Sequence, residues 1–140
     1  MFKLRRLNIP NGKLPFYLLE EDGNIPYQLF REAIVKDGNY ESQINKIDAW
    51  MARRACKEPV PLTKVKPLGK RDRNDKILDF EYKTDMIRVY SFAYAGGEVI
   101  WDGERKDPKA QDRTILRLRT IKVRFYEQIA ADKEVQIQDL

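Results

Sequence analysis

The segment "IRVYSFAYAGGEVIWDGERK", residues 87–106, places an arginine among aromatic side chains in a pattern that could bind nucleic acid. If residues 87–94 form a strand, alternation puts Ile87, Val89, Ser91 and Ala93 on one face and Arg88, Tyr90, Phe92 and Tyr94 on the other. A guanidinium can clamp a phosphate, and aromatic rings can stack on bases. The alternative for Arg88 is an internal salt bridge with Glu81 on a neighbouring strand.

Two further groups of basic residues could hold phosphates. One is a predicted loop with five cations: Lys64, Lys66, Lys70, Arg71 and Arg73. Closely packed lysines in this loop could depress one another's pKa until one of them acts as a base. The other is Arg105 with Lys106, directly after the last predicted strand, where small sheets often carry function. For the loop, the alternative is a flexible, solvated connector.

The composition excludes several kinds of chemistry. The 140 residues include no histidine and one cysteine, Cys56, so an intrachain disulfide cannot form and a zinc site is unexpected. Nucleophile systems that pair histidine with serine or cysteine are also excluded. Any acid–base chemistry must use lysine, tyrosine, arginine or carboxylates. We expect neither a metal nor a cofactor.

The net charge of +5 is unevenly distributed. Residues 51–76 hold nine basic and three acidic side chains, and residues 104–124 hold eight and three. Two separate basic segments are typical of a surface that binds a polyanion. A solvated basic face is the alternative, and it is the reading we favour for Arg113, Arg117 and Arg124 on the polar side of the third predicted helix.

The periodicities predict an α+β protein. A strand pair turns at Pro10-Asn11-Gly12, and a first helix follows, capped by Asn24, buried through Leu29 and Ala33, and ended by Gly38. A second helix runs from about Tyr40 to Cys56. Strands at about 77–83, 87–94 and 97–102 then form an antiparallel meander, and a third helix starts at about Asp107.

We therefore expect a small antiparallel sheet, made of this three-strand meander plus the N-terminal strands. Two helices should pack on its Val89/Ala93 face, with a C-terminal helix added. The length predicts one domain over 1–140: an N-terminal hairpin extension (1–24), a core (25–106), and a C-terminal helix and tail (107–140). No apolar run could span a membrane and no secretory signal precedes the first strand, so a cytoplasmic protein is expected.

Several short motifs resemble the RelE/ParE family of toxins from bacterial type II toxin–antitoxin systems. Lys66-Pro67-Leu68 matches that family's Lys-Pro-Leu segment. Glu81-Tyr82-Lys83 resembles its Glu-Leu-Arg strand end, with lysine in place of arginine, and Arg88-Val89 matches its strand arginine. The resemblance covers roughly residues 26–106; the N-terminal hairpin and the long third helix depart from the family pattern.

The resemblance implies a RelE-like toxin that cleaves mRNA as a metal-independent endoribonuclease, as members of that family usually do on the ribosome. It also implies a cognate antitoxin protein that neutralises the toxin. On this interpretation the catalytic residues are Lys64, Lys66, Arg88 and Tyr90. The residues that bind nucleic acid are Lys70, Arg71, Arg73, Lys83, Arg105 and Lys106.

Two alternatives of other classes remain open. One is a non-catalytic basic binding protein on the same fold, either a ParE-like topoisomerase inhibitor or a nucleic-acid adaptor. The other is a phage-derived structural or interaction module whose basic surface is incidental.

Overall fold

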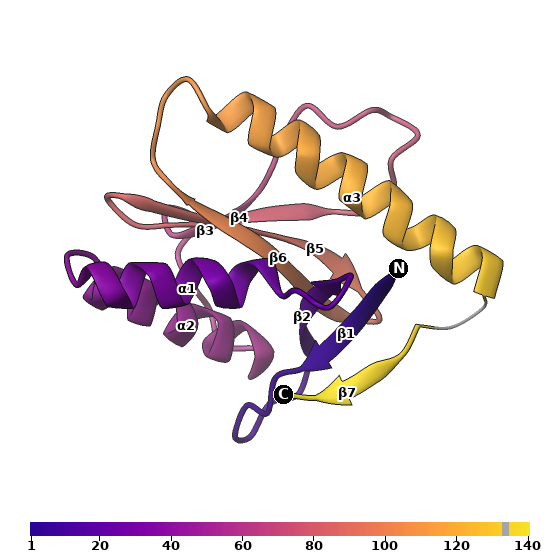
Figure 1. Ribbon diagram of the computed structural model, residues 1–140, viewed down its shortest axis with the longest axis horizontal. Coiled ribbons are helices and arrows are strands. Elements are labelled where there is room, and N and C mark those ends of the chain that lie inside the picture. The colour runs from indigo at the N-terminus through magenta and orange to yellow at the C-terminus, as the bar shows by residue number, and fades with distance from the viewer. Residues whose placement is uncertain (133–134) are drawn as a thin grey trace.

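The computed structural model describes residues 1–132 and 135–140, which contain three helices and one mixed sheet of seven strands in the order β3-β4-β5-β6-β2-β1-β7 (Figure 1). In chain order the elements are β1 (Phe2–Arg6), β2 (Phe16–Glu21), α1 (Pro26–Asp37), α2 (Glu41–Ala55), β3 (Val65–Pro67), β4 (Asp79–Lys83), β5 (Ile87–Tyr94), β6 (Gly97–Arg105), α3 (Gln111–Asp132) and β7 (Ile137–Asp139).

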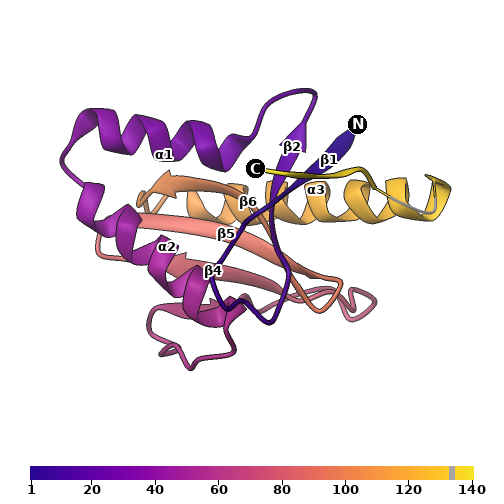
Figure 2. The same ribbon diagram turned by 90° about the horizontal axis from the view of Figure 1, so that it is seen from below.

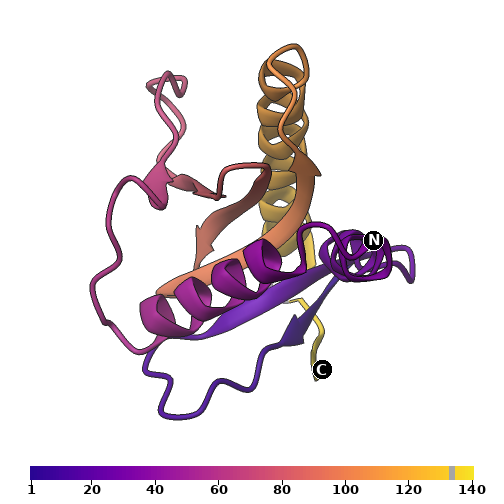
Figure 3. The same ribbon diagram turned by 90° about the vertical axis from the view of Figure 1, so that its left-hand side faces the viewer.

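Helices cover both faces of the sheet. Helices α1 and α2 lie against one face and α3 crosses the other, so the sheet is the middle of three layers (Figures 1 and 3). Each face has its own apolar core. Val89 and Ile100 pack with Ile44 and Ile47 of α2, whereas on the opposite face Phe92 packs with Phe125 of α3.

The alternation of side chains along β5 is confirmed. Ile87 and Val89 face the layer of α1 and α2, and Tyr90 and Phe92 face α3. The meander is also present, because β4, β5 and β6 are antiparallel neighbours. The apolar stripe predicted for the second helix is buried as expected, at Ile44, Ile47, Met51 and Ala55. In the third helix Leu118, Ile121 and Phe125 are buried, with Ile115 and Ile129 packed beside them.

The predicted fold class is wrong in the size and type of the sheet. The N-terminal hairpin does not stand apart from the meander, because β2 pairs with β6 in parallel, from Phe16 opposite Glu98 to Leu18 opposite Ile100. The sheet is also extended by β7, which pairs in parallel with β1 (Figure 2). Such pairings join segments far apart in sequence and leave no local periodic signal, which explains the error.

One short segment differs from its prediction, and the C-terminal tail, for which the sequence predicts no element, contains a strand. The loop predicted between the second helix and the meander contains β3, which pairs with β4 from Val65 opposite Tyr82 to Pro67 opposite Phe80. The C-terminal tail contains β7, while residues 133 and 134 of that tail lie outside the described residues.

Helix α1 differs from its prediction in two ways. It starts at Pro26 after Ile25, and Asn24 makes no side-chain cap. Its buried residues are Tyr27 and Ile34, not Leu29 and Ala33, which are exposed. The helix sequence is only weakly amphipathic, so the position of the sheet determines which side of the helix is buried. Gly38 ends the helix in the left-handed conformation (φ 82°), as predicted.

Close backbone contact fixes the junction between β2 and β6. The backbone N–H of Glu98 donates to the carbonyl oxygen of Pro15 at 3.1 Å. A Cβ atom on Gly97 would lie 1.6 Å from that same oxygen. Only glycine fits there, so the sequence Gly97-Glu98 allows the hairpin to dock on the meander.

Within the described residues, we find no helix that combines the length and the apolar character needed to cross a membrane.

Candidate nucleic-acid interface

Arg88 lies near the start of β5 on the face covered by α3. Its cross-strand partners are Lys83 on β4 and Glu104 on β6. The guanidinium Nε lies 3.5 Å from Oε2 of Glu81, an ion pair without hydrogen-bond geometry. The Arg88 side chain is 16% exposed and that of Glu81 is 1% exposed, so both charges are largely removed from water.

The guanidinium of Arg88 is incompletely satisfied. Its Nε and Nη1 atoms are buried and have no hydrogen-bond partner in the described part of the chain. Buried donors without partners are uncommon and cost about 1–3 kcal/mol each. These two nitrogen atoms have almost no accessible surface, so an anion would remove this cost only with a rotation of the Arg88 side chain that exposes them. Guanidinium N–H groups then match phosphate oxygens in pairs.

Lys83 and Lys106 add positive charge around Arg88. The backbone N–H of Lys106 donates to the carbonyl oxygen of Met86 at 2.8 Å, which holds the end of β6 beside the start of β5. Burial, followed by the charges of Arg88 and Lys83, lowers the pKa of the Lys106 ammonium below its ordinary value of 10.5. The charges of Arg88 and Lys83 are therefore close enough to disfavour the ammonium form of Lys106, and an anion would relieve that repulsion.

Glu81 is the acidic centre of this group. Besides Arg88, it contacts Gln111 at the start of α3, whose Nε2 donates to Oε2 of Glu81 at 2.5 Å. Lys66 lies directly opposite Glu81 in the pairing of β3 with β4. We call Lys66, Glu81, Lys83, Arg88 and Lys106 the Arg88 cluster.

The sequence predicts only one role for Glu81, that of a salt-bridge partner of Arg88. The alternation of Phe80, Glu81 and Tyr82 was visible, but only the pairing of three strands and α3 shows how many groups converge on this carboxylate.

The aromatic residues of β5 are core residues. Tyr90 and Phe92 have no exposed surface, and the rings of Phe92 and Phe125 are 5.2 Å apart. The Tyr90 hydroxyl donates to Oε1 of Glu104 at 2.8 Å, and Thr114 of α3 donates to the other oxygen of that carboxylate. Burial, followed by these interactions with Glu104, raises the pKa of Tyr90. Helix α3 thus covers the aromatic row that we expected to face RNA.

The loop cations do not gather at Arg88. The Lys64 ammonium lies 5.8 Å from the ring centre of Trp50, on α2. Arg71 donates through Nη1 to the carbonyl oxygens of Asp75 and Ile77, both at 3.0 Å, so it stabilises its own loop. Lys70 and Arg73 are exposed on that loop.

Arg105 also points away from the Arg88 cluster. Its Nη2 donates to Asp37 of α1 at 3.0 Å, and its guanidinium lies 5.4 Å from the ring centre of Tyr40. Of the ten predicted site residues, the structure brings together Lys66, Lys83, Arg88 and Lys106 around Glu81, with Tyr90 buried behind them.

A buried network joins the basic loop to α3. The Lys122 ammonium is 2% exposed and donates to Asp75, to Asp79 and to the carbonyl oxygen of Ile77, at 2.5, 2.9 and 2.7 Å. Arg119 pairs with the same Asp79 at 3.0 Å. All three Lys122 donors have acceptors, so we interpret this network as an anchor for the loop. Sequence reasoning missed it, because Lys122 looks like any other polar residue of a basic helix.

A second buried network lies on the opposite face of the sheet. Glu98 is 4% exposed and accepts hydrogen bonds from Tyr82, Ser91 and Arg54, at 2.8, 2.7 and 2.7 Å. Arg54 belongs to α2, whereas Tyr82, Ser91 and Glu98 belong to the sheet, so this network joins α2 to the sheet.

Among residues 1–132 and 135–140 we find no group of three or more His, Cys, Asp or Glu side chains that could hold a metal ion. Comparison of the chain with protein-family models, with curated proteins and with solved structures gives no match.

Proposed function

We propose that this protein is a RelE-like, metal-independent endoribonuclease that cleaves mRNA at the Arg88 cluster. The observation that carries the proposal is the buried guanidinium of Arg88, with two unpaired nitrogen atoms, next to the ammonium groups of Lys83 and Lys106. An RNA phosphodiester supplies the acceptor oxygens and negative charge that this arrangement lacks.

The residues of the cluster suit cleavage by the neighbouring ribose hydroxyl. Arg88 would stabilise the negative charge that develops on the phosphorane oxygens. The lowered pKa of Lys106 increases the share of its side chain that is a neutral amine, and in that form it would accept the proton of the 2′-hydroxyl while the hydroxyl oxygen attacks phosphorus. The bond to the 5′-oxygen then breaks, and the ammonium of Lys66 or Lys83 would protonate that leaving group. The products are a 2′,3′-cyclic phosphate and a free 5′-hydroxyl.

This assignment changes four of the roles taken from the resemblance: Lys64 and Tyr90 lose a catalytic role, and Lys83 and Lys106 gain one. Lys66 and Arg88 keep theirs. Lys64 lies against Trp50, and the Tyr90 hydroxyl is bound to Glu104, so neither is placed to touch RNA at Arg88. The proposal gives proton transfer to Lys106 instead. Binding of mRNA alone or on the ribosome, a cognate antitoxin and a cytoplasmic location remain parts of the proposal that rest on the resemblance.

The second candidate is a non-catalytic binding protein with the same basic surface, such as a ParE-like inhibitor or a nucleic-acid adaptor. The ion pair of Arg88 with Glu81 favours it, because that pair holds part of the charge of Arg88 even without a ligand. Such a protein would use the Arg88 cluster for affinity only.

One experiment separates the two candidates. Because Arg88→Ala alone would leave the buried Glu81 unpaired, we would compare wild type with the double variant Glu81→Gln/Arg88→Met, which removes both charges. Cleavage and binding of a fluorescent single-stranded RNA are measured without divalent ions, together with the melting temperature. Arg117→Ala, which alters an exposed arginine on α3, is the matched control.

For an endoribonuclease, wild type and Arg117→Ala cleave, and the double variant loses about 100-fold or more in rate with a preserved melting transition. Salt-sensitive binding without cleavage by wild type would support the second candidate. Equal cleavage by wild type and the double variant would contradict the assignment of Arg88. Absence of any RNA binding would contradict both the endoribonuclease and the nucleic-acid adaptor, and would leave the ParE-like inhibitor, whose target is a protein.

A further inference from the structure

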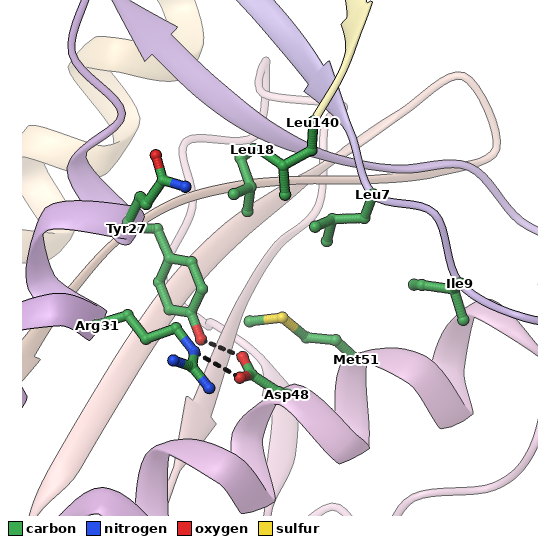
Figure 4. A pocket seen from close by; sticks show the side chains of 9 residues that line it. Leu7, Ile9, Leu18, Tyr27, Arg31, Asp48, Met51 and Leu140 are labelled. Carbon is green, nitrogen blue, oxygen red and sulfur yellow. Dashed lines mark hydrogen bonds and ion pairs between the residues drawn. The ribbon is translucent and has the colours of Figure 1, made fainter. Parts of the chain in front are cut away.

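A pocket lies on the other side of the molecule from the Arg88 cluster, where the N-terminal hairpin meets α1 and α2 (Figure 4). Its volume is about 260 Å³. Figure 4 shows aliphatic side chains and a thioether around most of it, contributed by Leu7, Ile9, Leu18, Met51 and Leu140.

Backbone hydrogen bonds hold the walls of this pocket in place. The N–H of Leu7 donates to Phe16 at 2.9 Å, and the N–H of Leu14 donates to Ala55 at the end of α2 at 2.8 Å. The N–H of Leu140 donates to Arg6 at 3.2 Å. The cavity is therefore bounded by anchored segments and is formed before any ligand arrives.

One wall of the pocket is polar. The Tyr27 hydroxyl donates to Oδ1 of Asp48 at 2.5 Å, and Nε of Arg31 donates to Oδ2 at 2.8 Å. A carboxylate has about four acceptor positions, so Asp48 keeps capacity for another donor. Figure 4 shows the Asp48 carboxylate between α1 and α2 at the edge of the apolar walls. Its side chain is 35% exposed, which leaves it accessible to a ligand.

Size and charge limit what could bind. Protein interiors are close-packed, and an apolar cavity of roughly 150 Å³ is enough for benzene. A pocket of about 260 Å³ would accommodate a body of about ten non-hydrogen atoms by the same scale. The charges of Arg31 and Asp48 cancel, so a ligand ion would enter an apolar space with no free counter-charge.

We infer that this pocket binds a small uncharged molecule with an apolar ring system and one N–H or O–H group, which donates to Asp48. Indole has this chemistry: nine non-hydrogen atoms by its formula, a flat apolar body and one N–H donor. Met51 can adapt to the shape of such a ring, because its thioether side chain is flexible and polarisable. The inference is independent of the proposed RNA site, which lies on the α3 face.

The test is a titration of the full-length protein with indole, followed by backbone amide NMR. We expect saturable shifts at residues that line the pocket, with a dissociation constant of about 1 mM or tighter. Indene has the same ring size without the N–H group, and it should bind about 5- to 10-fold more weakly. Equal affinity for indole and indene, or shifts spread away from the pocket, would overturn the inference.

Two variants test the location. Ile9→Trp should fill the cavity from a partly exposed position and reduce indole affinity more than 10-fold while the protein keeps its melting transition. Asp48→Asn should reduce affinity for indole and leave affinity for indene unchanged; Asp85→Asn, at an exposed site outside the pocket, is the matched control. Unchanged indole binding in Ile9→Trp would overturn the inference by itself.

Discussion

The guanidinium of Arg88 is paired with a carboxylate and still has unpaired nitrogen atoms. Glu81 neutralises its charge at 3.5 Å, yet two of its nitrogen atoms have no hydrogen-bond partner in the described part of the chain. A phosphate and Glu81 would therefore compete for one cation. The strength of anion binding depends on how firmly the carboxylate holds Arg88.

Replacing Glu81 with glutamine should strengthen RNA binding. The change keeps the shape and an acceptor oxygen but removes the negative charge that competes with phosphate. We expect the affinity for single-stranded RNA to rise about 3- to 10-fold at low salt, measured by fluorescence anisotropy, corresponding to roughly 1 kcal/mol.

Glu41→Gln is the matched control for this prediction, because Glu41 is exposed at the start of α2 and should leave the affinity unchanged. Weaker RNA binding in Glu81→Gln, with folding intact, would show that the carboxylate holds Arg88 in its binding orientation instead of competing for it.

Asp102 predicts a pH dependence of stability. Burial raises its pKa above the ordinary 3.8, and the hydrogen bond from the N–H of Gly103 only partly offsets this. The folded state therefore binds the proton more tightly than the unfolded state. This carboxyl costs no stability below pH 3.8, and the cost grows as pH rises through the folded pKa.

Asp102→Asn should consequently be more stable than wild type at pH 7, with a difference that shrinks as the pH falls toward 3. Urea unfolding of both proteins across this range measures it. Asp112→Asn, at an exposed site on α3, should show no such trend. A difference that grows toward acid pH would mean that the ionised carboxylate is stabilised by the fold.

At the scale of elements, the parallel pairing of β2 with β6 joins the N-terminal hairpin to the rest of the sheet. At the junction the backbone of Gly97 and Glu98 lies directly against the Pro15 carbonyl group. Buried pairs then attach helices to the same sheet, Glu98 with Arg54 for α2 and Asp79 with Lys122 for α3.

Gly97→Ala should destabilise the protein strongly. The added Cβ would lie 1.6 Å from the carbonyl oxygen of Pro15, and only a backbone shift could relieve that contact. We expect a loss of about 3 kcal/mol or more in the free energy of unfolding, measured with denaturant. Amide exchange should increase first in β1 and β2.

Gly69→Ala provides the matched comparison, since nothing lies within 4 Å of the added atom there, and its effect should stay within about 0.5 kcal/mol. Equal stability of the two variants would mean that β2 does not dock on β6 as described.

At the scale of the whole molecule, helices cover both faces of the sheet, so RNA cannot lie flat across β5. RNA would have to approach the Arg88 cluster beside the start of α3 and the edge strand β3. Binding there would use a few local phosphate contacts in place of a broad stacking surface.

RNA affinity should therefore fall with salt in proportion to a small number of contacts. Four cations of the Arg88 cluster, Lys66, Lys83, Arg88 and Lys106, predict a slope of about −3 in log K against log salt concentration for single-stranded RNA. Lys83→Ala should reduce that slope by about 0.7, whereas Lys109→Ala, at an exposed site outside the cluster, should not. Affinity independent of salt would contradict binding through phosphates.

The local structure could be predicted from the order of the residues alone. Alternation in β5, the apolar stripes of α2 and α3, and the glycine after α1 follow from periods and backbone preferences that act over a few residues. The same local patterns place Arg88 on a strand and predict Glu81 as its ion-pair partner.

Long-range packing establishes which helix covers each face of the sheet and which cations lie close together, and neither could be predicted from the sequence. The parallel pairs of β2 with β6 and β1 with β7 join segments distant in sequence, and α3 covers the aromatic row that alternation alone left open. Lys64, Arg71 and Arg105 carry the same charge as Lys83 and Lys106, but contacts with Trp50, Asp75 and Asp37 turn them elsewhere. Charge is a property of a residue, whereas the distance between two charges depends on long-range packing.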